Sequence, residues 1–142
     1  MIIGGSMETS CGLVLVNYGT VLLLQYPQGH WDLPKGHVEP DDLDCRATAV
    51  RELKEETGIM EVVIVDGFKE KTSYSYKLKN KTKTKQVFWF IAKTEELSVK
   101  LSNEHRNYMW LNWELAIDLV THKETKGVLN KAKNFLDNRS IS

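Results

Sequence analysis

The amino-acid sequence predicts a single domain of the mixed α/β (α+β) class, and three observations support this prediction. Runs of β-branched and aliphatic residues end at turn residues, as strands do, and three other segments carry apolar residues at helical spacing. The composition, 42% hydrophobic and 27% charged, is that of an ordinary globular protein. No repeat or linker-like segment divides the 142 residues. We therefore expect one domain over residues 7–142, preceded by a flexible extension at residues 1–6.

The N-terminal part of the chain is expected to form two strands, a loop and a helix. The segment CGLVLVNYGTVLLLQ (11–25) predicts two strands around a tight turn at residues 17–19. The segment YPQGHWDLPKG (26–36) is punctuated by prolines and glycines, so it predicts a loop with WDL as a short extended piece. A helix is expected to begin near residues 41–44, where aspartates supply caps, and to end at Gly58.

The C-terminal part is expected to form a strand, a hairpin, a further strand and two helices. MEVVIVDGF (60–68) predicts a strand, and KEKTSYSYKL (69–78) and TKQVFWFIAK (84–93) predict the arms of a hairpin joined by the lysine-rich KNKTK. YMWLNW predicts another strand. WELAIDLVTHK (113–123) and KGVLNKAKNFLDN (126–138) carry apolar residues at helical spacing, so they predict helices.

Charge and cysteine content argue against several classes of function. The chain carries 19 basic and 19 acidic residues, so its net charge does not favour a stable nucleic-acid partner or a membrane surface. No apolar run approaches the ~20 residues of a membrane span, and the N-terminus lacks the pattern of a signal peptide. Cys11 and Cys45 are too few for a disulfide scaffold, so we expect two reduced, packed thiols in a cytoplasmic protein.

Acidic residues concentrate in the predicted helix and in the loop before it. Residues 36–59 hold seven of the 19 acidic residues. Within the helix, Glu52, Glu55 and Glu56 are spaced i, i+3 and i+4, so they share one side, where like charges repel. One interpretation is a solvated acidic face. The other is a site for a hard divalent cation, because Mg²⁺ takes oxygen ligands from carboxylates, water and substrate phosphate.

Three motifs resemble those of a known family. Gly36 and RELKEETGI (51–59) are similar to the Nudix box, G-x5-E-x7-R-E-U-x-E-E-x-G-U, in which U is a bulky aliphatic residue. HWDLPKGHVEP (30–40) and LSNEHRNYMWL (101–111) resemble segments of the Nudix hydrolases that cleave diadenosine tetraphosphate asymmetrically. The similarity extends over about residues 11–116.

The first half of the box departs from the family pattern. Its glutamate should stand six residues after the glycine and its arginine fourteen residues after, but here Asp42 stands at the first position and Arg51 fifteen residues after Gly36. The junction before the helix is thus one residue longer. Either Asp42 or Asp44 replaces the missing glutamate, or that outer ligand is dispensable.

The resemblance implies a fold and a reaction. The fold would be a Nudix-type α/β/α sandwich with a central mixed β-sheet, a catalytic loop-helix-loop and an antiparallel hairpin. The reaction would be a hydrolysis that depends on Mg²⁺, with Mn²⁺ as a substitute, and that splits diadenosine tetraphosphate into ATP and AMP by attack of water on phosphorus. The protein would be a monomer whose partner is a small nucleotide.

Two alternatives to this reaction stay open. One is a Nudix pyrophosphohydrolase that acts on another nucleoside polyphosphate, a capped RNA end or an inositol pyrophosphate. The other is a nucleotide-binding module without catalysis, whose expected signature would be the loss of a box glutamate.

The resemblance also implies roles for the acidic residues. Arg51 would orient the glutamates through charge-assisted hydrogen bonds. Glu52 and Glu104 are equal candidates for the general base. The metal ligands would be the carbonyl of Gly36 and the carboxylates of Glu52, Glu55, Glu56 and Glu104.

Candidates for phosphate binding lie near the box glycine and in the hairpin. Lys35, His30 and His37 flank the expected metal site, although a solvated histidine is the alternative for each imidazole. Lysines alternate along residues 77–85, so in an extended strand they share one face. We expect Lys81 and Lys83 to contact the polyphosphate, with a solvated hairpin tip as the alternative.

Three tyrosines are candidates to stack on an adenine ring. Tyr74 and Tyr76 share one face of the predicted hairpin, and Tyr26 precedes the loop that leads to the box. A flat ring offers contact with a base at low entropic cost. Cross-strand packing accounts equally well for Tyr74 and Tyr76, and His122 is a weaker candidate for the same stacking.

Overall fold

The structure is a computed structural model that describes residues 5–141, with the side chains of residues 7–139. The described residues form β1 (Gly5–Asn17), β2 (Thr20–Gln25), β3 (Trp31–Asp32), β4 (Lys35–His37), α1 (Cys45–Thr57), β5 (Val62–Leu78), β6 (Lys81–Thr94), β7 (Asn107–Asn112), α2 (Trp113–Leu119) and α3 (Lys123–Ile141). The first four residues of the proposed extension lie outside the described residues, whereas Gly5 and Ser6 belong to β1.

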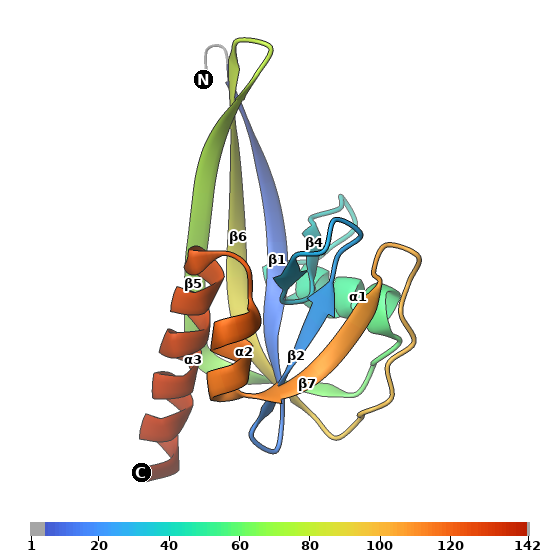
Figure 1. Cartoon of the computed structure of the whole chain (residues 1–142), viewed down its shortest axis with the longest axis vertical. Coiled ribbons are helices and arrows are strands. Elements are labelled where there is room, and N and C mark those ends of the chain that lie inside the picture. The colour runs from blue at the N-terminus through green and yellow to red at the C-terminus, as the bar shows by residue number, and fades with distance from the viewer. Residues whose placement is uncertain (1–4, 142) are drawn as a thin grey trace.

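The strands form one mixed sheet with helices on both faces (Figure 1). The order is β3-β2-β1-β6-β5, with β4 paired to β1 and β7 paired to β2. β1 runs parallel to β6, and the other pairs are antiparallel. Val14 and Val16 of β1 pack with residues of α2 and α3, whereas Leu13 and Leu15 pack with residues of α1, because successive side chains of a strand point to opposite faces. The protein is therefore the α/β/α sandwich that the resemblance implies.

β5 and β6 form a long hairpin that projects, with the start of β1, beyond the body of the protein (Figure 1). The turn residues Lys79 and Asn80 have φ angles of 52° and 65°, as a two-residue hairpin turn requires. The register shifts between Val65 and Glu70, where Gly67 has a φ of 97°. The strand and the hairpin arm predicted at residues 60–78 are therefore one strand with a bulge. We call residues 71–87 the arm.

α1 has the boundaries that the sequence predicts. Asp44 is its N-cap, because the Asp44 side chain accepts a hydrogen bond from the Ala47 N–H at 2.8 Å. Gly58 ends the helix in the left-handed conformation, with a φ of 79°. Leu53 and Ala49 are fully or almost fully buried against the sheet.

Two other elements differ from the prediction. The sequence predicts a loop at residues 26–36, but its last two residues belong to β4, which pairs with β1. The helix predicted at residues 113–123 ends at Leu119, and α3 begins at Lys123. In the described part of the chain, no helix is both long and apolar enough to cross a membrane.

The prediction of two separate thiols is wrong. Cys11 and Cys45 form a disulfide across 34 residues, and their α-carbons are 5.6 Å apart. Cys11 pairs with Gly36 in the sheet, and Cys45 is the first residue of α1. The disulfide therefore joins the start of the carboxylate-bearing helix to the strand beside the box glycine, a long-range contact that spacing alone does not reveal.

Candidate active site

Gly36 and Glu52 meet where β4 approaches α1. The sheet places Gly36 opposite Cys11 of β1, and the Glu52 carboxylate lies directly against the α-carbon of Gly36. A Cβ atom at position 36 would collide with that carboxylate. Only glycine therefore permits this approach between the strand and the helix.

Glu56 is a buried carboxyl group, with 4% of the residue exposed. The backbone N–H of Lys35 donates to its Oε1 at 3.2 Å. Burial raises the pKa of Glu56 to about 9, and the charges of Glu52 and Glu104 act in the same direction against the opposing effect of Lys35. Even beside the Lys35 ammonium group, this raised pKa favours the protonated form of Glu56 at neutral pH when no metal ion is bound.

The loop between β6 and β7 brings Glu104 to the end of α1. The Ser102 N–H in this loop donates to the Glu56 carbonyl at 3.1 Å. Burial, followed by the charge of Glu55, raises the pKa of Glu52, and Glu104 adds to the effect. The structure thus gathers Glu52, Glu56 and Glu104, which come from two separate sequence motifs.

Arg51 connects α1 with the acidic residues that precede it. Its guanidinium bonds both carboxylate oxygens of Asp42 at 2.9 Å, one oxygen of Glu55 at 2.9 Å, and Glu52 at 3.3 Å. The hydrogen bonds from Arg51, followed by one from a backbone N–H, hold the pKa of Asp42 well below its usual range. This geometry fits the orienting role expected of Arg51.

The two aspartates that were candidates to replace the missing box glutamate have different partners. Asp42 forms the paired hydrogen bonds with Arg51, and its Oδ2 also accepts from the Thr48 hydroxyl at 2.7 Å. Asp44 caps the helix. Asp42 therefore takes the position from which a carboxylate can fix Arg51.

A row of rings crosses the loop before β3. His105 meets Tyr26 edge-on at 4.6 Å between centroids, Tyr26 stacks on His30 at 4.6 Å, and His30 lies 5.6 Å from His122. Burial raises the pKa of Tyr26 to about 12 and lowers the pKa of His30. Tyr26 is thus an inner member of the row, which ends at the exposed His122.

Lys35 supports this row from the side. Its ammonium group lies 4.8 Å from the centroid of the Tyr26 ring, donates to the Tyr26 hydroxyl at 3.2 Å and pairs with Asp32 at 3.3 Å. Burial acts to lower the pKa of Lys35, but Asp32 and Tyr26 outweigh it and hold the pKa above its usual value. Lys35 therefore keeps its positive charge next to Glu56.

The candidates on the arm share one face of the hairpin. Tyr76 pairs with Lys83, Tyr74 pairs with Lys85, and the two tyrosine rings are 6.4 Å apart. Lys81 lies directly after the turn, at the tip of the arm. Figure 1 shows this tip well away from α1, so the structure does not bring Lys81 to the carboxylates.

A chain of polar contacts connects the arm with the end of β4. Lys85 lies 3.8 Å from Glu8, and Glu8 lies 3.9 Å from the imidazole of His37. Lys85 belongs to the predicted lysine alternation, but the sequence did not single it out. Its proximity to His37 depends on the parallel pairing of β1 with β6, for which the sequence carries no local signal.

The site fits a hard divalent cation in its chemistry. The candidate ligands supply only oxygen atoms, and the buried Glu56 requires either a proton or a cation. Within residues 5–141, no three acidic, histidine or cysteine side chains already surround one point as ligands, and Arg51 holds Glu55. A cation would therefore have to draw the carboxylates together in competition with Arg51.

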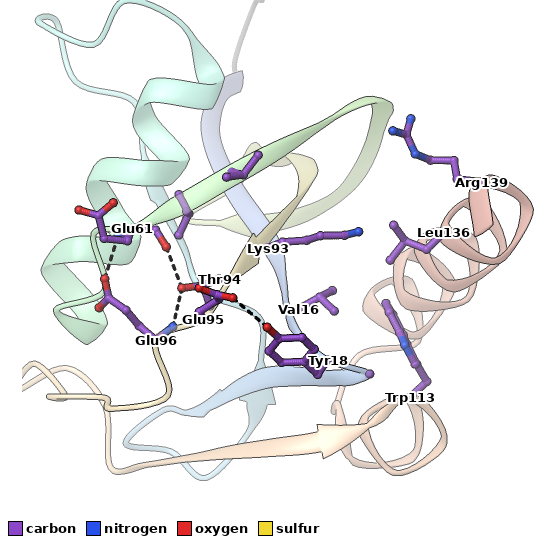
Figure 2. Close-up of a pocket in the computed structure, with 13 residues that line it drawn as sticks. Val16, Tyr18, Glu61, Lys93, Thr94, Glu95, Glu96, Trp113, Leu136 and Arg139 are labelled. Carbon is purple, nitrogen blue, oxygen red and sulfur yellow. Dashed lines mark hydrogen bonds between the residues drawn. The ribbon is translucent and has the colours of Figure 1, made fainter. Parts of the chain in front are cut away.

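A cavity of about 900 Å³ lies away from these residues (Figure 2). Its lining comes from the β1–β2 turn, the body ends of β5 and β6, the start of α2, and α3. It includes Tyr18, Lys93, Glu95 and Trp113. The Tyr18 hydroxyl donates to Glu95 at 2.8 Å across one side of it. None of the site residues proposed from the sequence lines this cavity.

The fold and the gathered carboxylates agree with a comparison of the whole sequence against protein families. The family profile described as NUDIX domain matches residues 8–133. The chain belongs to the Nudix family. Nudix hydrolases generally use divalent metal ions, in agreement with the oxygen-rich site.

Several relatives of this Nudix chain carry the name bis(5'-nucleosyl)-tetraphosphatase (asymmetrical). The mouse protein is 37% identical over 142 residues, which cover 89% of this chain and 94% of the relative. The Caenorhabditis elegans protein is 36% identical over 117 residues, covering 81% and 83%. The crystal structure of a C. elegans Ap4A hydrolase binary complex has a TM-score of 0.78 at 34% identity and covers 92% of this chain and 98% of that chain.

A more distant structure shares the fold alone. The E. coli dihydroneopterin triphosphate pyrophosphohydrolase has a TM-score of 0.68 at 20% identity, covering 87% of this Nudix chain and 92% of that chain.

Proposed function

We propose that this chain hydrolyses dinucleoside polyphosphates and cleaves diadenosine tetraphosphate asymmetrically into ATP and AMP. The observation that carries the proposal is the contact between two motifs. The loop with Glu104 is bonded to the end of α1, beside Glu52 and Glu56 of the Nudix box. The names of the mouse and C. elegans relatives support the same substrate.

The proposed metal ion is Mg²⁺, with Mn²⁺ as a substitute, because the candidate ligands are carboxylate and carbonyl oxygens. They are the Gly36 carbonyl and the carboxylates of Glu52, Glu55, Glu56 and Glu104. When bound, the ion neutralises phosphate charge and lowers the pKa of a coordinated water. Arg51 holds Asp42 and Glu55 and so limits the positions that the box glutamates can take.

The general base is Glu52 or Glu104. Glu52 is partly buried beside Gly36, and burial, followed by the charge of Glu55, raises its pKa above that of an ordinary glutamate in the metal-free site. Glu104 is exposed on a loop, where it is free to reach a water molecule from the solvent side. The two candidates are distinguished by replacing each glutamate with glutamine and measuring kcat as a function of pH. Only the variant that lacks the general base should lose the acidic limb of the pH–rate profile, because that limb reports the ionisation of the base.

The proposed substrate path runs from the carboxylates toward the arm and the row of rings. Lys35, His30 and His37 would contact phosphates, and Lys83 would neutralise the far end of the polyphosphate. An adenine ring would stack on Tyr74 or Tyr76 of the arm, or on the end of the row formed by Tyr26, His30 and His122. Lys81 is the candidate with the least structural support, because it lies at the tip of the arm (Figure 1).

Product analysis tests the proposal. Diadenosine tetraphosphate is incubated with the protein and Mg²⁺ in ¹⁸O-labelled water. The nucleotide products are then separated, and their masses are measured by mass spectrometry. We expect ATP and AMP in equal amounts, with the label on one of them. Two molecules of ADP would contradict the proposal. So would rapid hydrolysis of a nucleoside triphosphate, a capped RNA or an inositol pyrophosphate beside an inert dinucleotide.

A further inference from the structure

His105 holds an unpaired polar atom in the interior of the site. Among the described side chains, its Nε2 is the one buried nitrogen or oxygen without a hydrogen-bond partner. The residue is 7% exposed, so bulk water has little access to this nitrogen as a hydrogen-bond partner. Buried polar atoms in native proteins are nearly always bonded, and an exception calls for an explanation.

The neighbours of His105 indicate which ring nitrogen carries the hydrogen. The Ser102 hydroxyl accepts a hydrogen bond from the Glu104 N–H at 3.3 Å and lies 3.2 Å from the Nδ1 of His105. Because that hydroxyl has one hydrogen to give, the bonding pattern is complete when it donates to Nδ1. A neutral imidazole that accepts at Nδ1 carries its hydrogen on Nε2.

The Nε2 atom faces the carboxylate of Glu56. It lies 3.7 Å from Oε2, somewhat beyond hydrogen-bond range, and both side chains are almost fully buried. The other oxygen, Oε1, accepts from the Lys35 N–H at 3.2 Å. The edge of His105 also meets the Tyr26 ring, which limits rotation of the imidazole. A shift of less than 1 Å would close the remaining gap to Glu56.

We propose that His105 is a positioning residue for Glu56: its Nε2–H donates to Oε2 when Glu56 is ionised as a metal ligand. The Lys35 N–H on one oxygen and the His105 N–H on the other then fix the plane of the carboxylate. The remaining lone pairs of Glu56 would then be available to hold the metal ion. A donor beside a ligating carboxylate commonly changes metal affinity about 10- to 100-fold when removed. This inference rests on the proposed function only in taking Glu56 as a metal ligand.

The test compares two amide substitutions. In His105→Gln the amide nitrogen reaches the position of Nε2, so the donor to Glu56 is kept. In His105→Asn the amide reaches only the position of Nδ1, so the contact with Ser102 is kept and the donor to Glu56 is lost. Mn²⁺ affinity is measured without substrate by titration calorimetry, and kcat and KM are measured with diadenosine tetraphosphate.

We expect His105→Asn to weaken Mn²⁺ binding about 10-fold or more and to lower kcat with little change in KM. His105→Gln should retain most of the wild-type Mn²⁺ affinity and most of the wild-type kcat. In a Glu56→Gln background, His105→Asn should cause no further loss of affinity, because its partner is already gone. Equal Mn²⁺ affinity in the wild type and His105→Asn, or equal losses in the Asn and Gln variants, would overturn the proposal.

A second measurement uses the wild-type protein, so it does not depend on whether the variants fold. In protein labelled with ¹⁵N-histidine, the imidazole of His105 should show an unprotonated Nδ1 and a protonated Nε2 in the Mg²⁺-loaded state. A hydrogen on Nδ1 would contradict the assignment. If the affinities follow the expected order but the dinucleotide is inert, the positioning role stands and only the proposed substrate falls.

Discussion

Glu56 is the carboxyl group of the site whose charge depends most on its surroundings. Its pKa is raised to about 9 by burial and by neighbouring carboxylates, from an ordinary value of 4.5. In the metal-free protein the folded state therefore holds a proton that the unfolded chain has released. The corresponding stability is fully present below pH 4.5 and is lost as the pH rises toward 9.

We expect the metal-free protein to lose stability steadily between about pH 5 and pH 9, and Mg²⁺ to reduce this loss, because a cation favours the ionised carboxylate. Urea unfolding in the presence of EDTA, and again with excess Mg²⁺, measures both effects. Glu56→Gln cannot ionise, so its metal-free stability should change less over the same range. An identical pH profile in wild type and Glu56→Gln would show that another group is responsible.

Asp42 and Asp44 have different partners although both are aspartates next to the same helix. Asp42→Asn replaces a charged partner of Arg51 by a neutral one, so Arg51 should hold the box glutamates less firmly. We expect kcat to fall roughly 10-fold, the scale of loss for residues that orient ligands. Asp44→Asn is the matched control, because asparagine caps a helix as well as aspartate does. Loss of activity only in Asp44→Asn would reverse this assignment.

At the scale of elements, α1 is held by its own caps and by one covalent bond. The caps need only Asp44 and Gly58, which belong to the helix boundaries. The disulfide between Cys11 and Cys45 closes a loop of 34 residues and restricts the unfolded chain. It also connects the helix to the strand that pairs with Gly36.

Reduction of the disulfide should lower the free energy of unfolding by about 3–4 kcal/mol, from the chain entropy of a loop of this length. Guanidinium unfolding with and without a dithiol reductant measures the difference. The Cys11→Ala/Cys45→Ala variant should unfold at the same midpoint with and without reductant. Two titratable thiols in the unreduced, unfolded protein would contradict the disulfide.

At the scale of the whole molecule, the arm is connected with β4 through the pairing of three strands. β6 carries Lys83 and Lys85, β1 lies between, and β4 carries His37. Lys83 faces the side of the sheet on which Lys85 and Glu8 lie, whereas Lys77 pairs with Thr82 on the opposite side. Of these two lysines, only Lys83 therefore lies on the face that carries the contacts of Glu8 with Lys85 and His37.

Lys83→Ala should raise the KM for diadenosine tetraphosphate roughly 2- to 5-fold, the effect of losing one exposed charge contact. The effect should shrink at high salt, because screening weakens the same attraction in the wild type. Lys77→Ala removes an equal charge from the opposite face and serves as control. A KM that rises equally in both variants would indicate general attraction by the arm and no specific contact.

Local features of the chain were predictable because their causes lie within a few residues. Capping residues and helical periodicity predicted α1, and turn residues predicted the reversals at residues 17–19 and near residues 79–83. The box and the LSNEHRNYMWL motif predicted Glu52, Glu56 and Glu104 as one site. This prediction depends on side-chain type and spacing, which a single sequence displays.

Other features depend on strands and loops that are distant in the chain. Strand register and packing decide four such features. They are the parallel pairing of β1 with β6, the disulfide, the different partners of Asp42 and Asp44, and the approach of His105 to Glu56. A shift of one residue in register turns each side chain of a strand to the other face. The sequence alone therefore determined which side-chain types the candidate site contains. The tertiary structure decided which of these side chains face one another and which polar atoms have no hydrogen-bond partner.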